Sequence, residues 1–268
     1  MAIGKLLMPL MSTQSARAIP DVIIGGAPRS GTTFLATMLD QHPGVYVAKP
    51  YIPEPKICLM AAKSSGEYND RYLALFKDAP NNVCLIEKTS NYFENMDALM
   101  RLASLNNGQF KFLFILREPV ARAYSNYLWS KQNGLETLDF NEALSLEGQR
   151  DSPFPPERSY VRPFDYLTRG YYDIYAERYL KEFGPNRVKF ILYENLFRNS
   201  ADTQKEIQDF IGLEHTILNS FENTRINALH NKQVPLAPEL EGELRARMTP
   251  SVKRFSMLTG LDVTIWGY

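Results

Sequence analysis

The chain has 268 residues, 44% of them hydrophobic, which is enough to bury a sizeable core in one large domain or two small ones. Thirty basic residues balance thirty acidic residues, so no global charge favours nucleic acid or an anionic membrane as a partner. Two cysteines are too few for a disulfide framework, and they predict a reducing compartment, the cytoplasm.

Residues 1–19 are expected to form a flexible arm in front of a single domain that comprises residues 20–268. The arm contains a brief apolar run that Pro9 interrupts, and this run is too short to span a bilayer. Ala16-Arg17-Ala18 is similar to a cleavage site, so a targeting role for the arm stays open. The His and Cys residues show no metal-ligand spacing, so we expect no metal site.

Residues 21–40 predict a strand, a loop and a helix in direct succession. Residues 22–24 are an apolar β-branched run typical of a buried parallel strand. The glycine-bearing stretch 25–31 cannot continue a strand or a helix, and helical spacing begins at Thr32. Backbone N–H groups and the positive end of the helix dipole then face the loop, which predicts a phosphate site.

The loop is one residue away from the P-loop pattern G-x-x-x-x-G-K-[ST]. Thr32 replaces the lysine that reaches the β/γ-phosphates in NTPases, and the cation is instead Arg29, inside the loop. This arrangement suits a single 5′-phosphate better than a triphosphate with Mg²⁺. A P-loop kinase or other NTPase, a non-catalytic nucleotide-binding module, and a plain glycine turn with a surface arginine remain the alternatives.

A second strand is expected at residues 45–47, followed by a stiff loop in which Glu54 stands between two prolines. A helix at 68–78 and a strand at 83–86 come next, and this strand delivers Glu87 and Lys88 at its carboxyl end. Ligands of open α/β sheets collect at the carboxyl ends of the strands, so these side chains should point toward the phosphate loop.

The strongest strand pattern covers residues 110–116, after a plausible helix at 95–105. Arg117 follows this strand directly, and Ser125 lies two turns into the next helix, where it can face back toward the arginine. An arginine with a hydroxyl is a good receptor for a phosphate monoester.

Residues 151–166 hold four prolines and four aromatic residues, which predicts a structured lid or cleft wall, or alternatively a surface linker. Further patterns predict a strand at 188–192 and helices at 168–183, 201–212, 239–249 and 251–259. Alternating strands and helices predict an α/β fold with a central parallel sheet flanked by helices.

Three segments resemble motifs of the sulfotransferases that use 3′-phosphoadenosine 5′-phosphosulfate, PAPS. Residues 27–33 look like the 5′-phosphosulfate loop P-[KR]-S-G-T-T, and residues 87–92 fit the segment Glu-Lys-[ST]-x-x-Tyr. Residues 116–125 match L-R-[DEN]-P-x-x-R-x-x-S, the 3′-phosphate motif, at every defined position. Glu54-Pro55-Lys56 is similar to the Lys-Glu-Pro segment of the heparan-type and bacterial branches, although Lys49 is separated from Glu54 by four residues.

The resemblance implies a P-loop-like sulfotransferase fold and transfer of a sulfonate group from PAPS, without a metal, to an acceptor hydroxyl or amine. The acceptor would be a carbohydrate, a glycolipid or a small natural product, with a peptide tyrosine as an open alternative, and the other product would be adenosine 3′,5′-bisphosphate. It implies catalytic roles for Glu54, Lys88 and Arg29, with Glu87 as an alternative base. The implied donor-binding residues are Arg29, Ser30, Gly31, Thr32, Thr33, Arg117, Ser125 and, in a basic loop, Lys232.

Overall fold

A parallel five-stranded sheet forms the centre of the computed structural model, which describes residues 19–105, 108–219 and 235–268. The strands lie in the order β2-β3-β1-β4-β5, and every neighbouring pair is parallel. Their bounds are β1 Val22–Gly26, β2 Val45–Val47, β3 Cys84–Lys88, β4 Lys111–Leu116 and β5 Val188–Leu192. The predicted central parallel sheet is confirmed.

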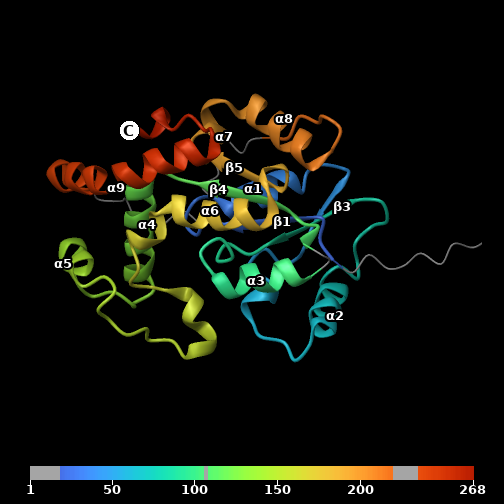
Figure 1. Ribbon diagram of the computed structural model, residues 1–268, viewed down its shortest axis with the longest axis horizontal. Coiled ribbons are helices and arrows are strands. Elements are labelled where there is room, and N and C mark those ends of the chain that lie inside the picture. The colour runs from blue at the N-terminus through green and yellow to red at the C-terminus, as the bar shows by residue number, and fades with distance from the viewer. Residues whose placement is uncertain (1–18, 106–107, 220–234) are drawn as a thin grey trace, which may run out of the picture.

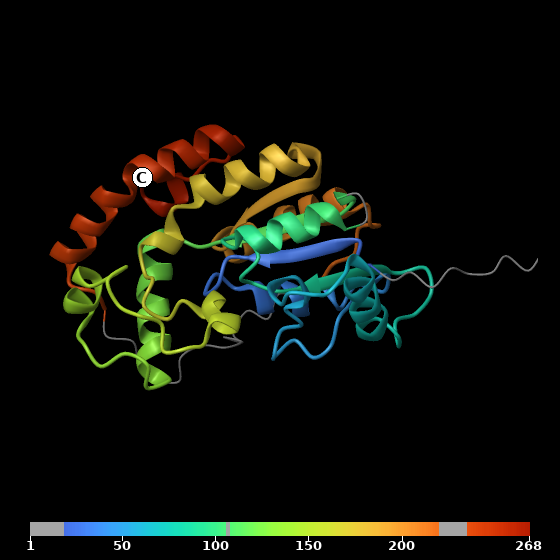
Figure 2. The ribbon, with the colours of Figure 1, turned by 60° about the horizontal axis from the view of Figure 1, so that its bottom comes forward.

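Alternate residues of each strand point to opposite faces of the sheet, and each face packs against its own helices. Ile24, Leu113 and Ile115 face one apolar cluster together with α1 (Thr32–Leu39), α7 (Asn195–Arg198) and α8 (Ser200–Ile211). Ile23 and Phe114 face the other cluster, with α3 (Met96–Ser104), α6 (Tyr172–Phe183) and α9 (Pro238–Thr259). Figure 2 shows these last three helices together on one side of the sheet.

Three further helices complete the described part of the chain: α2 (Ser65–Leu75), α4 (Pro119–Gln132) and α5 (Phe140–Ser145). Figure 1 shows α4 beside the sheet, with α5 farther out on the same side. In Figure 2, the blue strand β1 points toward α4, so the carboxyl edge of the sheet faces this helix.

The region after residue 237 differs from the sequence prediction, because α9 is one helix rather than two. Pro250 lies inside it and removes one backbone donor. Met248, before Pro250, and Val252 and Phe255, after it, lie at helical spacing and are almost fully buried, and their packing offsets the lost hydrogen bond. The prediction also missed α5, although Asp139 and Glu142 form a capping box at its start.

All five strands end at the same edge of the sheet, and each is followed by a segment that carries polar side chains. The phosphate loop follows β1, the proline-rich loop follows β2, and Arg117 follows β4. Tyr193 and Glu194 follow β5 in the same way. Of the helices that the structure describes, none is long and apolar enough to span a bilayer.

Candidate active site

The loop between β1 and α1 is fixed by two residues in the left-handed backbone region, Arg29 (φ 68°) and Gly31 (φ 92°). A side chain at Gly31 would also place its Cβ 2.7 Å from the Tyr193 ring, so only glycine fits there. Gly31 is the N-cap of α1, and the first N–H groups of this helix have no partner within the helix. The predicted succession of strand, loop and helix is confirmed, and anion binding at this loop stays a prediction.

The two predicted phosphate motifs meet in space, although they are far apart in the sequence. Arg29 Nε donates to Ser125 Oγ at 3.4 Å, which joins the loop to α4. The Arg117 guanidinium lies 5.6 Å from the centre of the Tyr193 ring, the same ring that packs against Gly31. Arg29, Arg117 and Ser125 therefore surround one region at the carboxyl edge of the sheet.

Several arginine charges act on one another in this region. Burial and, to a smaller extent, the charges of Arg117, Arg122 and Arg169 together lower the pKa of Arg29 to about 10. Arg122 is fully buried and donates to the Tyr166 carbonyl, while its Nε and Nη1 have no partner among the residues that the structure describes. Crowded arginines of this kind favour a bound anion, because an anion removes their mutual repulsion.

Lys88 lies between the phosphate loop and Glu54. Its Nζ donates to Thr33 Oγ1 at 3.1 Å and forms an ion pair with Glu54 Oε1 at 2.9 Å. Glu54 Oε2 accepts from the Ser90 amide at 3.2 Å and from Ser90 Oγ at 3.1 Å. The Lys88 side chain is only 3% exposed and that of Glu54 14%, so the carboxylate keeps limited access to the outside. The contact of Ser90 with Glu54 was not predicted, because nothing in the sequence indicates it.

Glu87, the alternative base, is fully buried. Its carboxylate accepts hydrogen bonds from Tyr72 and Tyr92, each at 2.6 Å, and from Thr89 at 2.8 Å. Burial raises its pKa, while the three hydroxyl groups counteract that rise. Since these contacts use its oxygens and no face is open, this geometry does not let Glu87 reach an acceptor.

The remaining predicted residues differ in how they are placed. Ser30 is fully buried and its amide donates to the Ala27 carbonyl, so it supports the loop from inside. Thr32 opens α1 and is 6% exposed. Lys232 lies outside the described residues.

The proline-rich segment 151–166 lies next to the Glu54 loop. The Tyr160 carbonyl accepts a hydrogen bond from Asn91 Nδ2 at 3.0 Å, and Lys56 Nζ lies 5.1 Å from the Tyr160 ring. Residues 156–161 form a short 3₁₀ helix there. These contacts favour the cleft wall over the surface linker.

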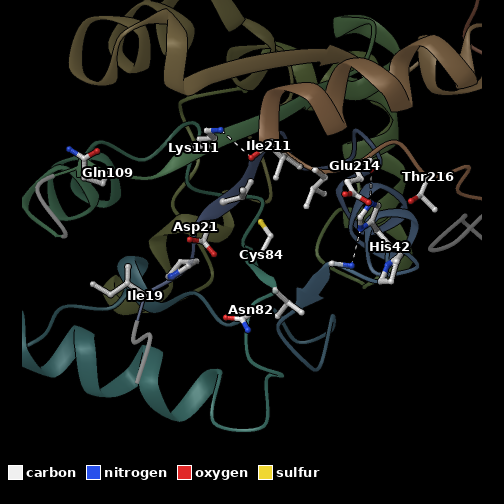
Figure 3. A pocket seen from close by; sticks show the side chains of 17 residues that line it. Ile19, Asp21, His42, Asn82, Cys84, Gln109, Lys111, Ile211, Glu214 and Thr216 are labelled. Carbon is white, nitrogen blue, oxygen red and sulfur yellow. Dashed lines mark hydrogen bonds between the residues drawn. The ribbon is translucent and has the colours of Figure 1, made fainter. Parts of the chain in front are cut away.

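A cavity of about 1000 Å³ lies at the opposite edge of the sheet, where the strands begin. Figure 3 shows His42, Asp21 and Lys111 around it. Asp21 accepts from the Leu85 amide, Lys111 donates to the Phe210 and Ile211 carbonyls, and both His42 nitrogens contact backbone groups. These polar side chains connect parts of the fold, and the predicted site residues that the structure describes do not line this cavity.

Comparisons with known proteins identify the family of this chain. Residues 19–254 match the family model of the sulfotransferase domain. The chain therefore belongs to the sulfotransferase family of enzymes. Within the described residues, this sulfotransferase has no group of three or more His, Cys, Asp and Glu side chains that could hold a metal ion.

Three similar proteins illustrate the relationship. Human heparan sulfate glucosamine 3-O-sulfotransferase 3A1 is 24% identical over 259 residues, which are 92% of this chain but only 58% of that protein. Mouse bifunctional heparan sulfate N-deacetylase/N-sulfotransferase 3 is 29% identical over 205 residues, 73% of this chain and 22% of that protein. A crystal structure of a sulfotransferase from Alicyclobacillus acidocaldarius has a TM-score of 0.76 at 26% identity, and the match covers 94% of this chain and all of that one (100%).

Proposed function

We propose that this sulfotransferase moves a sulfonate group from PAPS to a hydroxyl or amine of an acceptor molecule. The observation that carries this proposal is the contact between Arg29 and Ser125. It brings the loop that suits a 5′-phosphate and the motif that suits a 3′-phosphate around one region. The Lys88–Glu54 ion pair lies at the same edge of the sheet, next to Thr33 of the loop.

The side chains present fit a nucleotide with phosphates at both the 5′ and 3′ positions. The α1 amides, Thr32, Thr33 and Arg29 would hold the 5′-phosphosulfate, while Arg117 and Ser125 would hold the 3′-phosphate. The lowered pKa of Arg29 supports this fit, because it reflects the three nearby arginine charges as well as burial. A contact of Lys232 with the nucleotide at the same site stays a prediction.

Bound PAPS supplies the sulfonate group that is transferred. Glu54 would take the proton from the acceptor hydroxyl, since its carboxylate is the one that keeps access to the outside. Lys88 contacts both Glu54 and Thr33, so its ammonium can stabilise negative charge that develops on the donor side. Ser90 orients the Glu54 carboxylate through two hydrogen bonds.

For the acceptor we propose a carbohydrate, a glycolipid or a small natural product that offers a hydroxyl or amine. The names of two similar proteins refer to heparan sulfate, one to 3-O-sulfation of glucosamine and one to N-sulfation. They support a sugar hydroxyl or amine as the first group to test. A cytoplasmic location stays a prediction from the two cysteines.

Thermal unfolding tests the donor half of this proposal. Adenosine 3′,5′-bisphosphate should raise the melting temperature, while ATP with Mg²⁺ should not, because a ligand that binds only the folded protein stabilises it. A screen of PAPS consumption over carbohydrates, glycolipids and small phenols then tests turnover. Stabilisation by ATP with Mg²⁺ alone would favour an NTPase, and bisphosphate binding without turnover on any acceptor would favour a non-catalytic binding module.

A further inference from the structure

The last described residues, 264–268, lie beyond the region that matches the family model and contact the start of α4. We call them the aromatic segment, because they contain Trp266 and Tyr268. Trp266 is 2% exposed. Arg245 of α9 anchors the segment, since its Nη1 donates to the Trp266 carbonyl at 2.5 Å and its guanidinium lies 5.3 Å from the Tyr268 ring centre.

Both aromatic side chains donate to carboxylates at the carboxyl edge of the sheet, after β4 and β5. Tyr268 OH donates to Glu118 Oε1 at 2.7 Å, and Trp266 Nε1 donates to Glu194 Oε2 at 2.7 Å. Glu118 is the N-cap of α4 and accepts the amides of the first turn, Val120 at 3.1 Å and Ala121 at 2.6 Å. Burial and the charge of Glu118 raise the pKa of Tyr268 well above its ordinary value, so its hydroxyl stays protonated and donates.

Groups that Trp266 contacts also surround the peptide bond between Arg117 and Glu118. The N–H of this bond donates to Glu194 Oε1 at 3.1 Å, and its carbonyl accepts from Tyr172 OH at 2.8 Å. Trp266 touches both partners, because it donates to Glu194 and its ring lies 6.0 Å from the Tyr172 ring, centre to centre. The peptide plane that follows the Arg117 side chain is therefore held on both sides by groups that Trp266 contacts.

We propose that Trp266 and Tyr268 are positioning residues, which act through Glu194, Glu118 and Tyr172 to orient Arg117 toward the 3′-phosphate of the donor. Neither aromatic side chain needs to touch the nucleotide for this role. The inference rests on the proposed function, because it requires that Arg117 binds a 3′-phosphate. It extends that function to a segment that the family model does not cover.

The role predicts a selective loss of affinity. An arginine that is badly oriented loses its hydrogen bonds to the 3′-phosphate, whereas the 5′-phosphate is bound by another loop. Trp266→Phe and Tyr268→Phe should each weaken adenosine 3′,5′-bisphosphate by about 3- to 30-fold, the usual size of coupling through one or two lost contacts. They should weaken adenosine 5′-phosphate less than about twofold, so the ratio of the two affinities should fall.

Calorimetric titration of both nucleotides into the full chain measures this ratio. Tyr166→Phe is the matched control, since it removes a tyrosine-to-carboxylate hydrogen bond of 2.6 Å, to Glu136, that does not touch the Arg117–Glu118 peptide. The control should lower the melting temperature without changing the ratio. In turnover, the Trp266 and Tyr268 variants should raise KM for PAPS and leave kcat at saturating PAPS nearly unchanged.

Arg117→Ala, titrated in parallel, separates this inference from the proposed function. If Arg117→Ala loses the preference for the 3′-phosphate while both aromatic variants keep it, the positioning role is wrong and the donor site stands. Equal weakening of both nucleotides by the aromatic variants would also overturn the role, since it would show general destabilisation. If Arg117→Ala keeps the preference, the assignment of the 3′-phosphate site itself is wrong. Tyr268→Phe removes a single oxygen atom, so it decides the case if Trp266→Phe does not fold.

Discussion

Glu54→Gln tests the proposed chemistry most directly, because the substitution keeps the shape of the side chain and removes its ability to take a proton. We expect kcat to fall by roughly 10²- to 10⁴-fold, the usual contribution of a positioned acid or base. Affinity for adenosine 3′,5′-bisphosphate should stay the same or rise. The reason is that Lys88 loses its anionic partner, which lies 2.9 Å away, and its charge is then available to the donor.

The stability of Glu54→Gln should also fall, and the hydrogen bonds that Glu54 makes set an upper limit on this loss. Glu54 accepts from Lys88 and twice from Ser90, and a glutamine oxygen can replace only some of these bonds. Loss of charged hydrogen bonds of this kind costs about 1–3 kcal/mol. For a protein of this size that corresponds to a melting temperature lower by roughly 2–10 °C. Activity must therefore be compared at a temperature where both proteins are folded.

Glu87→Gln is the matched control for Glu54→Gln. Its amide N–H₂ would replace one carboxylate oxygen and face either the Tyr72 hydroxyl or those of Tyr92 and Thr89 in a fully buried place, so we expect a comparable loss of stability. Since Glu87 has no access to an acceptor, the folded variant should keep most of its kcat. The reverse pattern, in which Glu54→Gln stays active and folded Glu87→Gln is inactive, would refute Glu54 as the base.

Four further outcomes can be measured. Arg117→Ala should cost about 2–4 kcal/mol of affinity for adenosine 3′,5′-bisphosphate and barely alter adenosine 5′-phosphate, as read by calorimetry; equal losses would remove Arg117 from the site. Arg29→Ala should weaken both nucleotides alike, while the melting temperature without nucleotide stays equal or rises, because burial lowers the pKa of this arginine and three arginine charges add to that effect; unchanged binding would remove Arg29 from the nucleotide site. Gly31→Ala should abolish nucleotide binding, since its φ of 92° and a Cβ 2.7 Å from Tyr193 both oppose a side chain; a titration with normal affinity would contradict the loop geometry. Burial raises the pKa of the Cys58 thiol to about 12, so iodoacetamide at pH 8 should leave Cys58 unmodified until the protein is unfolded, as mass spectrometry can check; rapid modification of the folded protein would mean that this region opens.

The strands and the nucleotide loop could be predicted from the sequence because their signals are local. Apolar β-branched and aromatic runs predicted all five strands within one or two residues. The order of glycines and threonines predicted the cradle at the start of α1, and the rule that ligands collect at carboxyl ends placed Lys88 beside it.

Local signals failed where packing overrides them. Pro250 predicted a break between two helices, but the buried face of α9 continues past it. The capping box at Asp139 is visible in the sequence, yet α5 is only six residues long. So short a segment shows too little helical spacing of apolar residues to be distinguished from a loop. The helix before β5 begins at Tyr172 rather than 168, and the preceding Thr168–Gly170 forms a 3₁₀ turn instead.

The contacts that orient the site could not be predicted, because each joins distant parts of the chain. Ser125 and Arg29 are 96 residues apart, and Trp266 and Glu194 are 72 apart. A single sequence predicts neither pair. A buried polar group needs a hydrogen-bond partner, but the sequence does not indicate which residue that partner is. The sheet determines these pairs, because it brings the ends of β1, β4 and β5 to one edge.

Contacts between distant residues also position Glu54 in the proline-rich loop after β2. Lys49 does not reach the site, because it forms an ion pair with Asp40 at the end of α1, and Tyr51 donates to the same carboxylate at 2.6 Å. After Glu54, the Lys56 amide donates to Thr89 Oγ1 at 3.0 Å, so the loop is attached on both sides of the carboxylate. Lys88 then lies next to Glu54, the proposed base, although it comes from β3 rather than from the same loop. The residues between Lys49 and Glu54 therefore lengthen the loop without removing the lysine–glutamate pair, because the sheet supplies the lysine from a neighbouring strand.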